Sequence, residues 1–241
     1  MRLDVLFSPV LTDELFFTGK TTVVIDVLRA STTIITALKN DAREIVPVGN
    51  VEFAVKLSGG IFGGQTLLGG ERNTKKIEGF ALGNSPSEYT NEVVKGKTIV
   101  YYSTNGSRAI VKAKYSRSLF ICSFNNILVL SKHLKELNQD VIILCSGNNN
   151  FFSLEDAVCA GKLINELFTT KKKNELSDSA NAALTLFRTF GKDLYKILSE
   201  TEHGQLLIKN GFGEDLKACA ELNNMEIIPF YSGNTIKVLK I

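Results

Sequence analysis

Side chains that could take part in catalysis or ligand binding follow the end of an apolar segment near the N-terminus. The apolar segment 21–25 is followed at once by Asp26, then by Arg29 and the hydroxyl run 31–33. A carboxylate at the end of a buried strand is costly to desolvate unless a cation or hydrogen-bond donors meet it. The free N–H groups of a following helix start favour an anion. The sequence therefore predicts a functional Asp26 beside an anion-binding helix start. The alternative is that Ser31 only caps the helix and Asp26 pairs with Arg29.

Three later segments repeat this arrangement of polar residues after an apolar run. They are GGERN at 69–73, STNGSRA at 103–109, and SGNNN at 146–150 with the carboxylates Glu155 and Asp156 beyond it. Glycine allows a sharp turn or a close backbone approach to a ligand. Taken singly, each segment is also compatible with a turn or a polar connection. One of the two carboxylates could merely complement a helix dipole, because adjacent helical residues do not share a face. The repetition at one topological place favours a binding site.

The elements that must position these residues alternate between strands and helices. Apolar β-branched runs predict strands near 3–7, 22–27, 44–48, 65–68, 98–102, 118–122, 140–145, 226–229 and 235–240. Helical patterns predict helices near 31–40, 50–58, 86–94, 106–114, 126–138 and 154–168. This alternation predicts an α/β fold with a layered, largely parallel or mixed sheet flanked by helices. The site is expected at the carboxyl ends of the strands, where such sheets bind ligands.

Two of the predicted helices begin with recognisable caps. Ser85 is followed by Pro86 and Glu88, the arrangement of a capping box with proline at the first helical position. Ser153 precedes the pair 155–156 in a second, box-like start. We therefore expect helices to begin at these points.

The alternation of strand and helix patterns stops after residue 168. The segment TTKKKNELSD at 169–178 breaks the periodic pattern, and its lysine run predicts a solvated linker. Residues 178–221 turn mainly helical before the last strands. The length predicts a single domain over 1–241, or two intimate lobes near 1–168 and 178–241.

Composition narrows the classes of function. Of 241 residues, 44% are hydrophobic and 22% charged, and the net charge of +3 predicts no nucleic-acid partner. No apolar run reaches membrane-spanning length and the N-terminus lacks a signal-peptide pattern, so no membrane association and a cytoplasmic location are expected. The four cysteines lack CxxC or metal-ligand spacing and are expected to be reduced core thiols.

Histidine is scarce, and this limits the chemistry. Only His133 and His203 occur, which disfavours a zinc site or a histidine-based triad. Common phosphate motifs are also absent: there is no GxxxxGK(S/T) loop, no CxxxxxR loop and no DxDx(T/V) pattern of haloacid-dehalogenase phosphatases. GGIFGG at 59–64 does not spell GxGxxG. An enzyme of this composition must rely on carboxylates, arginines, hydroxyls and a hard metal ion.

Five segments, taken in order, resemble the 2-phosphosulfolactate phosphatase family. They are DVLRASTT (26–33), GGER (69–72), GNSP (83–86), STNGSRA (103–109) and FSLEDAVCAG (152–161), with a looser likeness at Glu202-His203-Gly204 and at Asp215. The resemblance implies a magnesium-dependent phosphomonoesterase that converts 2-phosphosulfolactate to sulfolactate and phosphate, a step toward coenzyme M. The run Asn148-Asn149-Asn150, and Ala81 where an acid would be natural, depart from the pattern.

The resemblance also implies roles for individual residues. The candidate catalytic residues are Asp26, Glu71 and Asp156. The candidate Mg²⁺ ligands are Asp26, Glu71, Glu155 and Asp156. The candidate substrate-binding residues are Arg29, Ser31, Thr32, Arg72, Asn84, Asn105, Gly106 and Arg108. A homodimer is a further family-based expectation.

The charges of this site and of the implied substrate match. A phosphate monoester carries roughly −1.5 to −2 charges near neutral pH, and a sulfonate and a carboxylate bring the ligand to about −4. One Mg²⁺ and two or three arginines would balance that charge, and arginine suits bidentate recognition of phosphate and carboxylate. Magnesium needs only one or two carboxylates and keeps several waters.

The sequence leaves the mechanism and the substrate open. Attack by metal-activated water is favoured over an aspartyl-phosphate on Asp26, because no histidine is at hand. The alternative functions are a phosphatase of another small anionic ester, including a haloacid-dehalogenase-like enzyme, and a non-catalytic module that binds a phosphate ligand.

Overall fold

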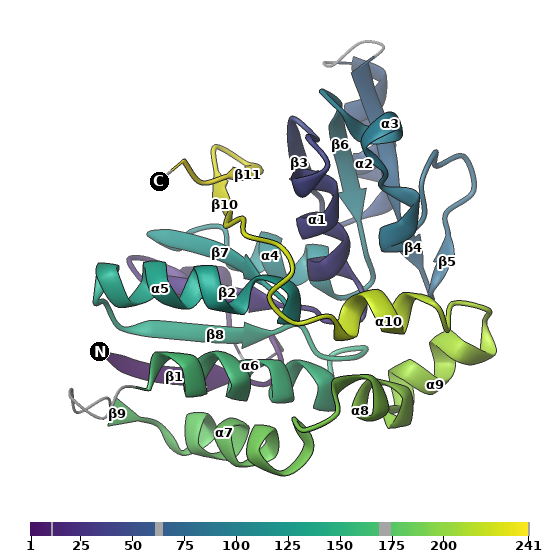
Figure 1. The fold of residues 1–241 in the computed structure, drawn as a ribbon. Helices are drawn as coiled ribbons and strands as arrows, with labels where there is room; N and C mark the ends of the chain where they lie inside the picture. The colour runs from purple at the N-terminus through teal and green to yellow at the C-terminus, as the bar shows by residue number, and fades with distance from the viewer. Residues whose placement is uncertain (11, 61–64, 169–174, 241) are drawn as a thin grey trace.

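The strands form one mixed sheet. In the computed structural model, which describes residues 1–10, 12–60, 65–168 and 175–240, the strand order is β5-β4-β6-β3-β11-β10-β7-β2-β8-β1-β9 (Figure 1). The bounds are β1 (Arg2–Leu6), β2 (Thr21–Ile25), β3 (Glu44–Pro47), β4 (Thr66–Arg72), β5 (Lys75–Lys76), β6 (Thr98–Tyr102), β7 (Ser118–Cys122), β8 (Val141–Cys145), β9 (Glu175–Leu176), β10 (Pro229–Ser232) and β11 (Thr235–Val238).

Two parallel blocks of strands are joined by an antiparallel hairpin. β1, β8, β2 and β7 pair in parallel, and so do β3, β6 and β4. Between the blocks, β10 pairs antiparallel with β7, and β11 with β3. Every residue of β2 and β6 is buried, as expected for central strands covered on both faces. The predicted α/β fold with a largely parallel or mixed sheet is confirmed.

Helices cover this sheet on both faces. Their bounds are α1 (Ala30–Lys39), α2 (Val51–Gly60), α3 (Asn91–Val94), α4 (Gly106–Lys112), α5 (Ile127–Leu137), α6 (Leu154–Leu167), α7 (Asp178–Phe190), α8 (Leu194–Glu200), α9 (Glu202–Lys209) and α10 (Asp215–Ala220), with 3-10 turns η1 (Glu14–Phe17), η3 (Pro86–Glu88) and η4 (Phe124–Asn126). None of the described helices is long and apolar enough to cross a membrane.

The alternation of side chains along β2 divides the core into two clusters. Val23 and Ile25 pack with α5 and α6, whereas Val24 faces the other side and packs with α1 and α4. The first cluster also contains residues of α7, α8, α9 and α10, so apolar packing crosses the boundary between the two expected lobes. In Figure 1 the helices α8, α9 and α10 lie beside the carboxyl ends of β4 and β8.

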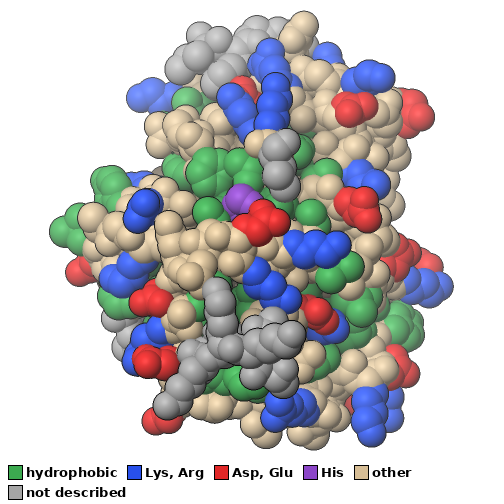
Figure 2. All heavy atoms as spheres, turned by 60° about the vertical axis from the view of Figure 1, so that its left-hand side comes forward, with side chains coloured by type: hydrophobic (Ala, Val, Ile, Leu, Met, Phe, Trp, Pro, Cys, Tyr) green, Lys and Arg blue, Asp and Glu red, His purple; other side chains and the backbone are tan. Residues whose placement is uncertain are grey.

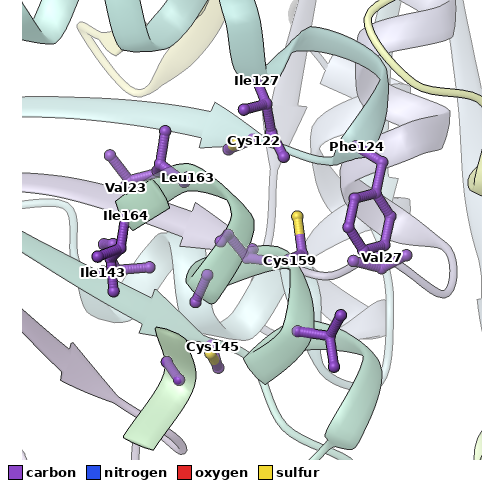
Figure 3. Packing of buried hydrophobic residues seen from close by; sticks show 14 of the residues in the cluster. Val23, Val27, Cys122, Phe124, Ile127, Ile143, Cys145, Cys159, Leu163 and Ile164 are labelled. Carbon is purple, nitrogen blue, oxygen red and sulfur yellow. The ribbon is translucent and has the colours of Figure 1, made fainter. Parts of the chain in front are cut away.

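The cysteines belong to this core. Cys122, Cys145 and Cys159 lie among aliphatic side chains of the sheet and of α6 (Figure 3). These three and Cys219 are buried and free of disulfides. Burial raises the pKa of the Cys145 and Cys159 thiols well above their usual range, so both stay protonated.

The helix predicted over 86–94 is wrong. The chain instead forms the single turn η3, leaves helical geometry at Tyr89, and then forms the short helix α3. Glu88 reaches back to the N–H groups of Gly83 (2.8 Å) and Ser85 (3.4 Å), as the capping pattern predicted. The Tyr89 carbonyl, however, accepts a hydrogen bond from Asn40 (2.7 Å). This tertiary contact replaces the intrahelical bond that a continuous helix would need.

Three other predicted elements change at their ends. The strand expected near 226–229 begins only at residue 229, as β10, because the backbone groups of Met225 and Ile227 form hydrogen bonds with Asn125 and Asn126 of η4. The strand expected at 65–68 continues as β4 to residue 72, which places Glu71 on a strand. The expected linker at 169–178 contains β9, which pairs with β1, and Ser177, which caps α7 by accepting the Ala180 N–H (3.1 Å). Residues 169–174 of that linker, and residues 61–64 of the glycine-rich segment, lie outside the described residues.

Candidate active site

Polar loops meet at the carboxyl ends of β2, β4, β6 and β8. The N–H of Thr104, after β6, donates to Glu71 of β4 at 2.7 Å. Asp156, beyond β8, accepts the N–H of Val27, after β2, at 2.9 Å. Within each parallel block, neighbouring strands end at one edge of the sheet. The antiparallel pairings between the blocks reverse the strand direction, so the carboxyl ends of the two blocks face each other and meet where Gly106, after β6, approaches Asp26, after β2. The expected position of the site is where these candidates converge.

Asp26 lies at the centre of this edge and is 5% exposed. Its Oδ1 accepts the N–H of Ala30 at 3.1 Å. A Cβ added to Gly106 would lie 2.5 Å from Oδ2, so only glycine lets the loop after β6 approach so closely. Burial raises the pKa of Asp26 to about 7. The Ala30 N–H opposes this rise, and the charges of Glu71 and Glu155 add to it.

Glu71 is fixed by donors on both of its carboxylate oxygens. Oε1 accepts the N–H of Thr104 at 2.7 Å. Oε2 accepts the N–H of Thr74 at 2.7 Å and the Thr104 hydroxyl at 3.1 Å. The direction of this carboxylate is therefore set jointly by the turn after β4 and the loop after β6.

Asp156 joins the start of α6 to the loops after β2 and β8. Besides Val27, it accepts the N–H of Gly147 (3.2 Å) and the hydroxyl of Ser146 (3.1 Å). Its own N–H donates to the cap Ser153 at 3.3 Å, as the predicted helix start requires. Burial raises the pKa of the Asp156 carboxyl well above its usual range, and the nearby Asp26 charge raises it further.

Glu155 faces the other way, toward His203. Its Oε1 lies 3.7 Å from the imidazole Nδ1, and burial raises the pKa of this carboxyl. Burial and the charge of Arg29 lower the pKa of His203 to about 4, so the imidazole is neutral at pH 7. His203 was not among the candidate site residues. The looser family likeness at 202–204 was the signal that could have found it.

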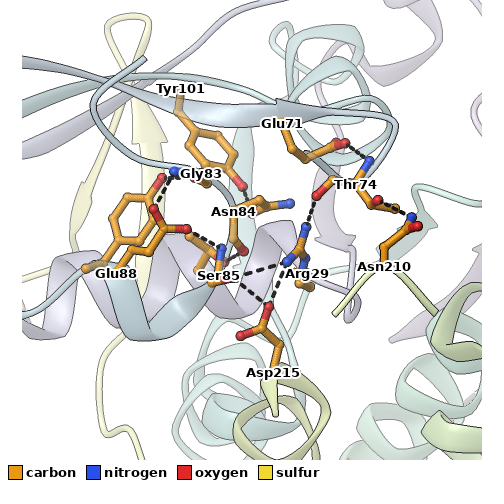
Figure 4. A network of polar contacts seen from close by, with 12 residues as sticks. Arg29, Glu71, Thr74, Gly83, Asn84, Ser85, Glu88, Tyr101, Asn210 and Asp215 are labelled. Atoms are coloured by element: carbon orange, nitrogen blue, oxygen red, sulfur yellow. Dashed lines mark hydrogen bonds and ion pairs between the residues drawn. The ribbon is translucent and has the colours of Figure 1, made fainter. Parts of the chain in front are cut away.

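The three candidate arginines have different surroundings. Arg29 is 2% exposed, and its guanidinium pairs with Asp215 at 2.7 Å (Figure 4). The alternative in which Asp26 pairs with Arg29 is therefore wrong. Arg72 and Arg108 are exposed and line cavities at the same edge of the sheet.

The remaining candidates make contacts within the chain. Ser31 Oγ accepts the Asp26 N–H (2.9 Å), Thr32 Oγ1 donates to the Val27 carbonyl (3.3 Å), Asn84 Oδ1 accepts the Tyr101 hydroxyl, and Asn105 Oδ1 accepts the Asn149 N–H (3.1 Å). Ser31 and Thr32 are buried, and Ser31 ties the start of α1 to the end of β2. Asn105 is only partly buried and lines two cavities.

A groove made of adjoining cavities lies over the carboxylates. The central cavity, of about 80 Å³, is lined by Glu71, Asn73, Thr74, Thr104, Asn105, Asn148, Asn149, His203 and Leu206. It shares lining residues with neighbouring cavities of about 310, 100 and 820 Å³. Arg108 lines the second of these neighbours and Arg72 the third. The exposed Arg72 and Arg108 thus line cavities next to one whose wall includes Glu71, and hydrogen bonds hold the Glu71 carboxylate in place.

The amino ends of β1, β2 and β8 hold a separate cavity of about 700 Å³. Its lining mixes Arg2, Lys20 and Arg117 with Asp4 and Asp140, and it includes no candidate site residue. Figure 2 shows the side of the molecule from which these strands begin, where blue basic and red acidic side chains are interspersed. Nothing in the family resemblance points to this edge.

The buried carboxylates suit a hard cation. Asp26, Glu71, Glu155 and Asp156 are each at most 6% exposed, and within the described ranges no lysine or arginine forms an ion pair with them. Oxygen ligands are those that Mg²⁺ prefers. In the part of the chain that the structure describes, no group of three or more His, Cys, Asp or Glu side chains is arranged to hold a metal ion. Mg²⁺ usually binds one or two carboxylates and keeps water in its other positions, so an ion held in this way would not need such a cluster.

The fold is that of an α/β protein with buried carboxylates at the carboxyl ends of its strands. The sequence matches the family described as 2-phosphosulpholactate phosphatase over residues 7–234. Curated relatives named probable 2-phosphosulfolactate phosphatase include one from Carboxydothermus hydrogenoformans, 43% identical over 95% of this chain and 92% of that protein. Others come from Symbiobacterium thermophilum (40% identical, covering 92% and 95%) and Clostridium acetobutylicum (37% identical, covering 98% and 100%). The chain belongs to the 2-phosphosulfolactate phosphatase family, a family of phosphoric monoester hydrolases.

Proposed function

We propose that this chain hydrolyses 2-phosphosulfolactate to sulfolactate and phosphate, with Mg²⁺ as its cofactor. The observation that carries the proposal is the set of buried carboxylates at the strand ends, flanked by the exposed Arg72 and Arg108. Carboxylates alone would repel a substrate of about −4 charge. A cation bound by Asp26 with Glu71 or Asp156 would remove that repulsion and stabilise charge that develops on the phosphoryl oxygens.

The arginines and amides of the groove would bind and orient the substrate. Arg72 and Arg108 line two different cavities that adjoin the central one, and this supports the proposal that they bind the sulfonate and carboxylate arms. The side-chain amides of Asn105, Asn148 and Asn149, which line the central cavity, would offer neutral donors to the ester. Charge-assisted contacts from arginine give both affinity and orientation.

Attack by water agrees best with the surroundings of Asp26. Its side chain is buried, and Gly106 lies against Oδ2, which leaves little room for a phosphorus atom to bond there. In the proposed step a water oxygen bonds to phosphorus while the bond from phosphorus to the ester oxygen breaks. The electron pair leaves with that oxygen, which takes a proton to become the hydroxyl of sulfolactate. A buried carboxylate of the cluster would accept the proton lost by the water.

Phosphate release is the experiment that tests this proposal. The purified chain would be incubated with 2-phosphosulfolactate, with Mg²⁺ or with EDTA, alongside esters that lack the sulfonate. We expect release that requires Mg²⁺ and is fastest for phosphosulfolactate. Tight binding without turnover would support a non-catalytic module instead. A trapped acyl-phosphate on Asp26 would replace the water mechanism with a covalent one.

We also propose a cytoplasmic homodimer that supplies sulfolactate for coenzyme M synthesis. All four cysteines are free thiols, which agrees with a reducing compartment. The pathway and the dimer rest on the family alone. Light scattering of the purified chain tests the dimer, and deleting its gene in a coenzyme M producer tests the pathway.

A further inference from the structure

Thr74 occupies an unusual backbone conformation beside the proposed active site. It lies in the turn between β4 and β5 with φ of 71°, after Asn73 with φ of 52°. A β-branched residue in this left-handed region is strained, and such strain persists only where the surroundings impose it. Thr74 is 5% exposed, so those surroundings are the protein itself.

Each polar group of Thr74 has a defined partner. Its N–H donates to Glu71 Oε2 at 2.7 Å. Its carbonyl accepts a hydrogen bond from Arg29 Nη2 at 2.7 Å, and its hydroxyl accepts one from Asn210 Nδ2 at 2.7 Å (Figure 4). The first bond joins the turn to a carboxylate of the proposed site, and the other two hold the turn in place.

Arg29 is itself held on several sides. Nη1 bonds to Asp215 at 2.7 Å and to Ser85 at 3.2 Å, and the guanidinium lies 4.3 Å from the centre of the Phe212 ring. Asp215 begins α10, and Asn210 follows directly after α9. The C-terminal helices therefore reach the end of β4 in two ways: directly, through Asn210 on Thr74, and indirectly, through Asp215 on Arg29.

We propose that Arg29 is a positioning residue: together with Asn210 it holds Thr74 in its left-handed conformation and so aims the Thr74 N–H at Glu71. Arg29 then acts on the reaction through Glu71 and does not contact the substrate. This inference rests on the proposed function, because the role of Glu71 is part of it. It also makes the C-terminal helices a necessary part of the site.

Arg29→Lys separates this role from substrate binding. Lysine keeps a positive charge opposite Asp215, but its single ammonium cannot reproduce the planar fork that reaches Asp215 and Thr74 together. We expect kcat to fall about tenfold and KM to stay within about twofold. Asn210→Ala removes the second contact at a partly exposed position and should lower kcat about threefold. Arg43→Lys, whose hydrogen bonds go to Thr98 at the other end of the strands, is the matched control.

Hydrogen exchange of the Thr74 amide, followed by NMR, gives a readout that does not depend on turnover. We expect exchange at Thr74 to be at least about tenfold faster in Arg29→Lys and Asn210→Ala and unchanged in Arg43→Lys. A raised KM with unchanged kcat would overturn the inference in favour of direct substrate binding. So would unchanged Thr74 protection, or a lower melting temperature with full kcat per folded molecule.

The two proposals fail in different ways. If the wild-type chain releases no phosphate from any ester, the proposed function fails, and Thr74 exchange alone then decides whether Arg29 and Asn210 hold the turn. If Arg29→Lys does not fold, Asn210→Ala decides by the same two measurements.

Discussion

The Asp156 carboxylate accepts the backbone N–H of Val27 at 2.9 Å, across 129 positions of sequence. Val27 follows Asp26, so a side chain of α6 fixes the backbone that carries the central carboxylate of the proposed site. Asp156 is also held by Ser146 and Gly147. The candidate catalytic residues Asp26 and Asp156 are thus joined through the Asp26–Val27 peptide unit. A substitution at either residue should therefore shift the position of the other.

Asp26→Asn should abolish nearly all turnover while keeping the fold. The amide is similar in size, but it binds a divalent cation poorly and cannot accept a proton. We expect a loss of at least about a thousandfold in kcat, measured as phosphate release in saturating Mg²⁺. Circular dichroism checks that the variant is folded. An active variant at ordinary Mg²⁺ concentrations would refute the assignment.

The same variant gives a pH-dependent stability prediction in the presence of EDTA. The pKa of Asp26 is raised from 3.8 to about 7, so the folded state keeps a proton that the unfolded state releases within this window. Stability from this group therefore falls as the pH rises from about 4 to about 7. Asn has no such dependence. The melting temperature of Asp26→Asn relative to the wild type should rise across that window and then level off, and a constant difference would contradict the raised pKa.

Gly106→Ala should impair the reaction although it replaces no charged residue. The added Cβ would lie 2.5 Å from Asp26 Oδ2 and 2.6 Å from the Ala30 side chain, so the loop or the carboxylate must move. We expect kcat to fall about tenfold or more, with a destabilisation of about 1–3 kcal/mol. Gly49→Ala is the control, because its Cβ would meet nothing closer than 3.9 Å. Equal effects of the two substitutions would argue against a tight fit at Gly106.

The sequence was sufficient to predict the edge of the sheet where the candidates gather. Apolar runs end at Asp26 and before Ser146, and β2 and β8 are neighbouring parallel strands, so their carboxyl ends lie together. The sequence did not predict how the ends of β4 and β6 meet them, because that block of strands runs in the opposite direction. It could not predict the partner of Arg29. Asp215 lies 186 residues away on a C-terminal helix, and no local pattern connects the two residues. The same limit applies to Thr74, whose conformation depends on contacts from distant segments.

Cys145→Ala and Cys159→Ala should leave phosphatase activity within about twofold of the wild type. Both thiols are fully buried among apolar side chains, and burial keeps them protonated. Each substitution creates a small cavity that should cost about 1 kcal/mol, or about 2–4 °C in Tm for a domain of this size. Phosphate release and thermal unfolding measure both effects. Loss of activity in a variant that is still folded would reopen a cysteine-nucleophile mechanism.

Arg72→Ala and Arg108→Ala should change substrate selectivity. Both residues are exposed at cavities that adjoin the central one, and in the proposed function they bind the anionic arms of the substrate. A charge-assisted contact contributes about 1.5–3 kcal/mol. Each substitution should therefore lower kcat/KM for phosphosulfolactate about ten- to a hundredfold, with the lower value expected where water screens the arginine. The loss should be smaller for a phosphate ester that has neither sulfonate nor carboxylate.

Measuring both substrates on both variants separates recognition of the arms from a general effect of charge. Arg188→Ala, on α7 and outside the cavities of the groove, is the control for removing one positive charge from the surface. If Arg72 or Arg108 acted only by raising the local concentration of anions, both substrates would lose rate in proportion to their charge, and added salt would erase the difference. A direct contact instead leaves a selectivity change that persists at high salt. Equal losses on the two substrates would show that these arginines do not bind the sulfonate or carboxylate.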